Sequence, residues 1–268
     1  MSKTRYVLLT GGTRGIGVHA AEALAEAGWT IVLVGRTMEA LERVARPIQA
    51  RRGLRSVQPE VLDLAGLEWN VGINHVGHAH LTWGLLDRLQ ANAPIVLTSS
   101  GAHRLEQDMP YMKAPRWPSA EELLWAPTDD PEMEQRRYPS SKLCNALFAV
   151  ELERRLKVRS RINEPGFVPG TGLARDQPAI ASFLFTWIMP AFAAWFPDGH
   201  TARHAGRHLA QMVLEPPSAS LVVVDQPRPL PEVDRDEVRA TELWTATLQA
   251  IARIRTSSSS IRHSVGGP

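Results

Sequence analysis

The order of apolar and polar positions predicts strands alternating with helices over the first part of the chain. Strand-like apolar runs and helical patterns follow one another at residues 6–9, 18–27, 31–34, 38–50 and 56–62. Short apolar runs that alternate with amphipathic helices are typical of a parallel sheet covered by helices. The pattern therefore predicts an α/β fold of the Rossmann type, with a doubly wound parallel sheet.

The rest of the chain continues this alternation around two long loops. We expect further helices and strands at residues 67–89 (helix), 95–98 (strand), 138–156 (helix), 221–224 (strand) and 238–254 (helix). Loops of the length of residues 102–137 and 170–199 handle substrate more often than they merely connect elements. We expect one domain over residues 1–255 and a disordered, serine-rich tail over residues 256–268.

Composition narrows the class of protein. The chain has 268 residues, of which 44% are hydrophobic and 22% charged, as in a globular protein that folds by burial. Its formal net charge of +2 gives no field that would gather nucleic acid, so we expect no nucleic-acid partner. The single cysteine, Cys144, cannot form an intramolecular disulfide, and the first residues do not resemble a secretory signal. We therefore expect a cytoplasmic protein.

One segment, residues 180–196, is nearly uncharged and rich in phenylalanine and tryptophan. It is shorter than the ~20 apolar residues of a membrane span, and Pro190 interrupts it. We expect an apolar lid or a packed helix here. Attachment of this segment to a membrane surface stays open as an alternative, and so does a homo-oligomer.

The glycine-rich sequence TGGTRGIG occupies residues 10–17, between a predicted strand and a predicted helix. Glycines allow a tight turn and let a pyrophosphate approach the backbone amides at the positive end of the helix. The pattern predicts nucleotide binding, and the alternative is a turn that only caps the helix. The expected cofactor contacts are Gly11, Thr13, Arg14, Gly15, Ile16 and Gly17.

The residue after the second strand indicates which cofactor is preferred. A site that reads the 2′-hydroxyl of NAD has an acid there, whereas this chain has Arg36, which would attract a 2′-phosphate. Arg14 adds a second positive charge, so we expect NADP(H); the alternative for Arg36 is a solvated surface arginine. Asp63, after the third strand, is expected to accept a hydrogen bond from the adenine amino group, or to be a turn residue only.

A second chemical signal is the sequence YPSSK at residues 138–142. Residues four apart share one helix face, so the Lys142 ammonium can lie near the Tyr138 phenol and favour its ionised form. A phenol with an ordinary pKa of ~10 is a poor acid–base group at neutral pH without such help. Ser99 and Ser100 end a predicted strand, where a hydroxyl can hydrogen-bond a substrate carbonyl.

Together these motifs resemble the short-chain dehydrogenase/reductase family. The similarity is greatest to its retinol-dehydrogenase-like and protochlorophyllide-reductase-like branch, in the segments GLEWNVGINHVGH, IVLTSSGAH, RYPSSKLCNALFAVEL, EPGFVPGTGLARD and ELWTATL. The resemblance implies a catalytic tetrad of Asn74, Ser100, Tyr138 and Lys142. In it Tyr138 is the acid–base, Ser100 orients the carbonyl, and Asn74 holds a water that links to Lys142.

The same resemblance implies further cofactor contacts. Pro165, Gly166 and Thr171 would lie beside the nicotinamide, and Asn74, Tyr138 and Lys142 would also belong to the cofactor site. Each assignment has a simpler alternative: Asn74 as a buried helix asparagine, and Pro165-Gly166 as an ordinary turn after a strand.

The chain departs from the family pattern after Asp63. The family has a helix and a strand ending in Asn-Asn-Ala-Gly, whereas here DLA at 63–65 runs directly into GLEW at 66–69. At ~1.5 and ~3.3 Å per residue, the ten residues 64–73 have no room for both elements. We therefore expect a sheet without one central strand. Compensation for this loss would require the flanking strands 6–9 and 95–98 to close by ~4.8 Å and pair directly.

The favoured function is an NADP(H)-dependent oxidoreductase that interconverts an alcohol and a carbonyl on a bulky apolar small molecule. One alternative is a catalytically impaired Rossmann protein that only binds nucleotide, as a pseudoenzyme or truncated copy, and a weaker one is a lipid-handling protein at a membrane surface. We expect no metal site, because the spacing of His75, His78 and His80 mixes helical and strand periods and no acid accompanies them.

Overall fold

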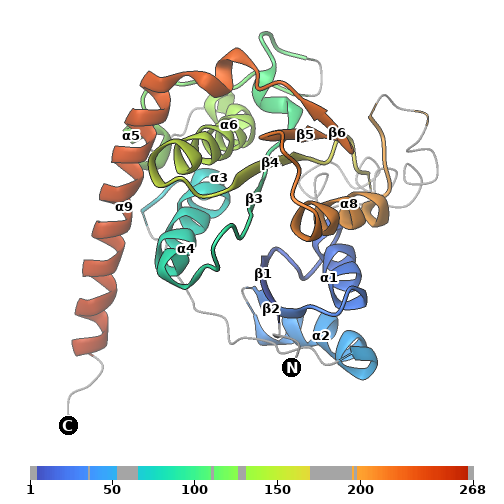
Figure 1. Ribbon diagram of the computed structural model, residues 1–268. Helices are drawn as coiled ribbons and strands as arrows, with labels where there is room; N and C mark the ends of the chain where they lie inside the picture. Colours follow the sequence, from blue (N-terminus) through green and yellow to red (C-terminus); the bar gives the residue numbers. More distant parts are fainter. Residues whose placement is uncertain are drawn as a thin grey trace. The chain divides into compact units, whose positions relative to one another are not determined.

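The computed structural model describes residues 5–35, 37–52, 66–109, 112–125, 131–169, 195 and 198–264. The chain divides into two units (Figure 1). Unit 1 comprises Met1–Val61, Pro165–Pro217 and Val223–Gln226, and unit 2 comprises Leu62–Glu164, Ser218–Val222 and Pro227–Pro268. Two predicted features lie outside the described residues. One is the third strand, predicted at residues 56–62, and the other is the apolar segment 180–196 apart from Trp195.

Unit 1 has a two-stranded parallel sheet. Its elements are β1 (Tyr6–Thr10), α1 (Ile16–Glu26), β2 (Thr30–Val34), α2 (Met38–Arg52) and α8 (Ala202–Leu214). Strand β1 pairs in register with β2, and the buried core includes Leu24, Ile31 and Leu33. Helix α1 packs closely on α8, because a Cβ at Gly206 would lie 2.5 Å from the Cβ of His19.

Unit 2 contains most of a four-stranded sheet in the order β3-β4-β5-β6. The strands are β3 (Ile95–Thr98), β4 (Ser160–Glu164), β5 (Leu221–Val223) and β6 (Gln226–Arg228), and β3 runs parallel to β4. Its helical elements are α3 (Trp69–Val71), π-helix η1 (Gly72–Val76), α4 (Gly77–Leu85), η2 (Leu86–Arg88), η3 (Gly101–Arg104), α5 (Ala120–Trp125), α6 (Pro131–Leu156), η7 (Glu232–Arg235) and α9 (Glu237–Ser264).

Helix α6 is the centre of unit 2 and contacts β3, β4, α3 and α9 (Figure 1). Its helical spacing predicts one apolar face with Leu143, Leu147 and Val150; Leu143 and Leu147 are buried, whereas Val150 is half-buried. Phe148 adds an aromatic cluster, with ring centres 5.3 Å from Trp83 and 5.9 Å from Trp244. This packing fixes the helix that carries Tyr138 and Lys142.

Several element boundaries differ from those expected. The helix expected over residues 67–89 is a succession of short helical segments with a π-helical middle. The expected loop 102–137 contains α5, and α6 begins at Pro131 because proline suits the first turn of a helix. Helix α9 continues to Ser264 where a disordered tail was expected, since no glycine or proline interrupts the sequence before Gly266.

The chain has the expected α/β architecture, and each of the described strands β1 and β3 pairs with a strand of the same unit. These strands belong to two separate sheets, β1 paired with β2 and β3 with β4. Each pair is packed by helices of its own unit, α1 and α2 on β2 and α6 on β3, which fixes the strand in that sheet. Among the described helices, none is both long and apolar enough to cross a membrane.

Candidate active site

The glycine-rich turn lies in unit 1, between β1 and α1. Gly11 and Gly15 adopt φ of 66° and 55°, in the left-handed region that favours glycine. A Cβ at Gly17 would lie 2.3 Å from the carbonyl oxygen of Gly11, so only glycine fits where the helix starts against the turn. Thr13 and Ile16 are half-buried in this turn, and Arg14 is exposed.

The amino end of α1 has the character of a phosphate site. Gly15 caps the helix without any side-chain hydrogen bond, and the first turn contains no acidic residue. The amides there meet no competing carboxylate, and the helix dipole favours an anion. The residues present therefore fit the pyrophosphate of a dinucleotide.

Pro165 and Gly166 also belong to unit 1, directly after β4. Gly166 has φ of 71°, and a Cβ there would lie 2.3 Å from the carbonyl oxygen of Asp198. The next residue, Phe167, pairs with Gly199 in a parallel bridge, so the two ends of the long loop meet. Three predicted cofactor contacts, Arg36, Asp63 and Thr171, lie outside the described residues.

All four residues of the predicted tetrad lie in unit 2. On α6, Nζ of Lys142 lies 5.7 Å from the centre of the Tyr138 ring and donates a 3.2 Å hydrogen bond to the carbonyl oxygen of Thr98. Burial lowers the pKa of Lys142 to about 8. The structure thus brings the ammonium and the phenol together at the end of β3, as the i, i+4 spacing predicted.

Ser100 follows β3 and caps η3, with its Oγ accepting a hydrogen bond from the backbone N–H of Ala102. A side-chain hydrogen bond joins Ser100 to Tyr138. Burial raises the pKa of Tyr138, and the hydrogen bond with Ser100 lowers it in opposition. Serine, tyrosine and lysine therefore form one connected group.

Asn74 lies in η1 and contacts helix α6, which carries Tyr138 and Lys142. Its Nδ2 donates a 3.0 Å hydrogen bond to Oγ of Ser141, which in turn donates to the carbonyl oxygen of Tyr138. The Asn74 carbonyl accepts a hydrogen bond from Nδ1 of His78 at 2.8 Å. The π-helical turn places Asn74 at α6, since a wider turn re-aims a side chain. His75, in contrast, is buried against Thr247.

Two supporting residues were not predicted from the sequence. Glu68 caps α3, accepting hydrogen bonds from the backbone N–H of Asn70 and Val71, and its Oε1 lies 3.1 Å from Nη1 of Arg137. Both side chains are almost fully buried. The ion pair fastens the start of the segment that carries Asn74 to the residue before Tyr138. A glutamate directly before a helical pattern indicates the cap, but no feature of the neighbouring sequence indicates that Arg137 is the ion-pair partner of Glu68.

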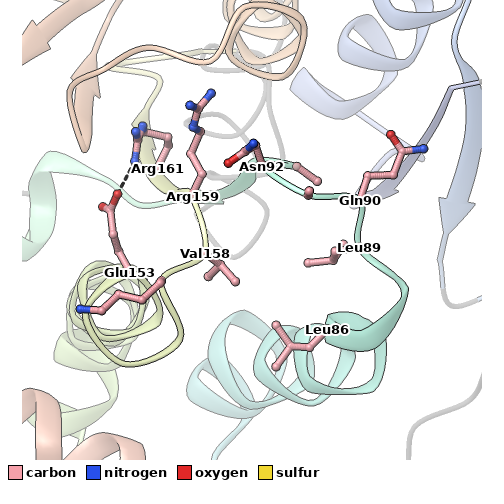
Figure 2. A pocket seen from close by; sticks show the side chains of 11 residues that line it. Leu86, Leu89, Gln90, Asn92, Glu153, Val158, Arg159 and Arg161 are labelled. Atoms are coloured by element: carbon pink, nitrogen blue, oxygen red, sulfur yellow. Dashed lines mark hydrogen bonds and ion pairs between the residues drawn. The ribbon is translucent and has the colours of Figure 1, made fainter.

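Figure 2 shows a pocket in unit 2. Its volume is about 460 Å³, and none of the tetrad residues lines it. It is lined by Leu86, Leu89, Gln90, Ala91, Asn92, Ala93, Glu153, Lys157, Val158, Arg159 and Arg161. Lining residues 86–93 precede β3, and lining residues 157–159 precede β4, whereas Ser100 follows the carboxyl end of β3. Ligands of open parallel sheets bind at the carboxyl ends, so this cavity is not the candidate active site.

Comparison of the chain with known proteins identifies its family. The family model for short chain dehydrogenases matches residues 5–112. Human retinol dehydrogenase 11 is 30% identical over 247 residues, which cover 77% of this chain and 72% of that protein. The chain belongs to the short-chain dehydrogenase/reductase family. Within it, the chain falls in the retinol-dehydrogenase-like branch, as the sequence motifs predicted.

Two further comparisons agree. The short chain dehydrogenase/reductase dpchH of Colletotrichum higginsianum is 27% identical over 312 residues, covering 92% of this chain and 75% of that protein. A crystal structure of an uncharacterised protein from Mycobacterium paratuberculosis superposes with a TM-score of 0.66 at 23% identity, covering 92% of this chain and 93% of that one. The chain is thus a member of an oxidoreductase family with an NAD(P)-binding Rossmann fold.

Proposed function

We propose that this chain is an NADP(H)-dependent oxidoreductase that interconverts an alcohol and a carbonyl on a bulky apolar substrate, with Tyr138 as the acid–base. The observation that carries the proposal is the connected group in unit 2. Tyr138 is hydrogen-bonded to Ser100 and lies beside the Lys142 ammonium. Together these three side chains are suited to one proton transfer to or from a substrate oxygen.

When bound, the nicotinamide supplies a hydride to the carbonyl carbon or accepts one from the alcohol carbon. In the direction of reduction, the Tyr138 hydroxyl donates its proton to the carbonyl oxygen, and in oxidation the phenolate takes that proton back. Ser100 donates a hydrogen bond to the same oxygen and holds it toward Tyr138. Lys142 stabilises the phenolate that proton donation leaves behind.

Two features of Tyr138 favour its use as a proton donor. Burial raises its pKa, so the phenol keeps its proton at neutral pH. The nearby Lys142, with a pKa of about 8, is a cation at that pH and favours release of the proton during the reaction. The site is therefore suited to reduction of a carbonyl at neutral pH.

The remaining assignments of the proposal rest on sequence position. Arg36 and Arg14 support NADP(H) over NAD(H) through charge-assisted hydrogen bonds to the 2′-phosphate. Asp63 would contact the adenine, Thr171 the nicotinamide end, and Asn74 a water near Lys142. The apolar segment 180–196 supports a large hydrophobic substrate, because such pockets are lined mainly by apolar side chains.

A catalytically impaired nucleotide-binding protein is a second candidate, and one observation favours it. The match to dpchH runs over 312 residues, more than the 268 of this chain, so that relative has residues without a counterpart here. Loss of a central strand would weaken catalysis before it abolished binding of the nucleotide.

Both candidates are tested by binding and turnover in one experiment. NADPH binding is followed by fluorescence, and a panel of long apolar and short hydroxylated carbonyls is then added. We expect NADPH to bind and the apolar carbonyls to be reduced. Tyr138→Phe should lower the rate by about 10²-fold or more with unchanged NADPH affinity, whereas Tyr6→Phe, at an exposed tyrosine of β1, should not. Binding without turnover in the unmodified chain would support the impaired protein instead.

A further inference from the structure

A fully buried imidazole lies directly behind Ser100. His103, in η3, has no exposed surface, and its Nδ1 contacts the carbonyl oxygen of Ser100. The same nitrogen lies 3.2 Å from Oγ of Ser99. On the other side of the ring, Nε2 lies 2.7 Å from Oδ1 of Asp234, which is also fully buried in η7. The ring thus connects the end of β3 to the C-terminal part of unit 2.

The partners of this ring fix its hydrogen-bond roles. A carbonyl oxygen only accepts, so Nδ1 of His103 must donate to Ser100. The Ser99 hydroxyl donates its own hydrogen to the carbonyl oxygen of Lys142 at 2.8 Å, which leaves its oxygen facing Nδ1 as an acceptor. Nε2 faces a carboxylate oxygen of Asp234 at 2.7 Å. The imidazole is therefore oriented from both sides.

A second carboxylate, that of Glu164, lies close to the same ring. Glu164, at the end of β4, places its Oε1 3.6 Å from Nδ1 of His103, and it also forms an ion pair with Arg104 of η3. Two carboxylates thus lie beside the His103 imidazole and the Arg104 guanidinium, in a region where an uncompensated charge would be costly. Within the described part of the chain, the second oxygen of Asp234 has no hydrogen-bond partner, so His103 provides the hydrogen bond to that carboxylate side chain.

We propose that His103, anchored by Asp234, is a positioning residue that holds Ser100 and the Lys142 turn of α6 in place for the reaction. One ring nitrogen contacts the backbone of Ser100 and, through Ser99, the backbone of Lys142. Loss of the imidazole ring would remove the link between the backbones of Ser100 and Lys142, while the side chains of both residues would stay intact. The inference rests on the proposed function for its purpose, but the positioning itself can be measured without turnover.

The test follows the environment of Tyr138 by NMR. The protein is labelled with ¹³C at tyrosine Cζ, whose chemical shift responds to hydrogen bonding, and Tyr138→Phe assigns the signal. Ser100→Ala should move the Tyr138 resonance, and His103→Ala should move it in the same direction. The shift in the double variant should be smaller than the sum of the two single shifts, because His103 acts in part through Ser100. A signal unmoved in His103→Ala, or shifts that add in the double variant, would overturn the proposal.

Two conservative variants separate the ring nitrogens. Asparagine places an amide N–H near the position of Nδ1, and glutamine places one near Nε2. We expect His103→Asn to keep the Tyr138 resonance close to its original position and His103→Gln to move it. The opposite order would refute the assignment, and this comparison remains decisive if His103→Ala does not fold.

A matched control separates positioning from loss of stability. Arg161, buried at the other end of β4, pairs with Glu153 at 3.0 Å. Arg161→Met should lower the melting temperature without moving the Tyr138 resonance, and an equal movement would show that any destabilisation has this effect. If the unmodified chain does not reduce any carbonyl, the proposed function fails. The NMR result still decides the role of His103 in that case.

Discussion

Nζ of Lys142 lies 5.7 Å from the centre of the Tyr138 ring, and the same nitrogen donates to the carbonyl oxygen of Thr98. Because burial lowers the pKa of Lys142 to about 8, the cation beside the phenol is present below that pH and lost above it. Burial raises the pKa of Tyr138, so the phenol keeps its proton over the same interval. The two groups therefore lose their protons in the order lysine, then tyrosine.

This order predicts the pH dependence of carbonyl reduction. We expect kcat/KM for reduction to be constant near pH 7 and to fall as the pH rises through about 8, because the lysine cation that stabilises the phenolate is lost. Lys142→Arg keeps its charge at high pH and should shift the fall upward, at the cost of a lower overall rate. Initial rates with saturating NADPH between pH 6 and 9.5 measure this. An unchanged fall in the arginine variant would assign it to another group.

The buried pair between Glu68 and Arg137 predicts a large loss of stability. Glu68→Ala removes the helix cap of α3 and leaves Arg137 buried without this carboxylate, which typically costs about 3–5 kcal/mol. Glu132→Gln breaks an ion pair with Arg136 at an exposed glutamate on α6 and should cost no more than about 1 kcal/mol. Urea unfolding of both variants measures the difference, and equal losses would show that the buried pair is not special.

The parts of the site that local patterns encode could be predicted from the sequence. The glycine turn and the Tyr138–Lys142 pair each depend on residues within one turn or one helix, and the structure forms both. Strand β4 was not predicted, because its sequence SRINE is polar, yet every residue in it is buried. Arg161 and Glu164 are paired with Glu153 and Arg104 from other elements, and no local pattern reveals such partners. Helix α8 was also not predicted. It follows the long expected loop 170–199, and no element was predicted between that loop and the strand at residues 221–224.

Cofactor preference tests the assignment of Arg36. If Arg36 and Arg14 contact the 2′-phosphate, NADPH should bind more tightly than NADH by about 1–3 kcal/mol. Arg36→Ala should remove most of this preference, whereas Arg43→Ala, at an exposed position on α2, should leave it intact. Fluorescence titration with both cofactors gives the two dissociation constants for each variant. A preference that survives in Arg36→Ala would place the 2′-phosphate elsewhere.

The last prediction concerns the helix and the strand that we expect to be absent after Ala65. The match to the relative dpchH runs over more residues than this chain contains, so dpchH has residues without a counterpart here. A central parallel strand is buried on both faces. With about four aliphatic side chains at ~1.5–3 kcal/mol each, it would contribute some ~6–12 kcal/mol, comparable with a typical net stability of ~5–15 kcal/mol. We therefore expect the chain to melt at a low temperature, to bind NADP(H) weakly and to turn over slowly.

Insertion of a helix and a strand ending in Asn-Asn-Ala-Gly after Ala65 should reverse these properties. The new strand would give β1 and β3 a shared partner and join two sheets into one, so both melting temperature and carbonyl reduction should rise. A glycine-serine insertion of equal length is the control, since it adds chain without a strand. Equal behaviour of the two insertions, or rapid turnover and one cooperative melt in the unmodified chain, would contradict the prediction. A displacement near 1 Å already costs catalysis about a hundredfold, so turnover should respond to the inserted strand more steeply than NADPH affinity does.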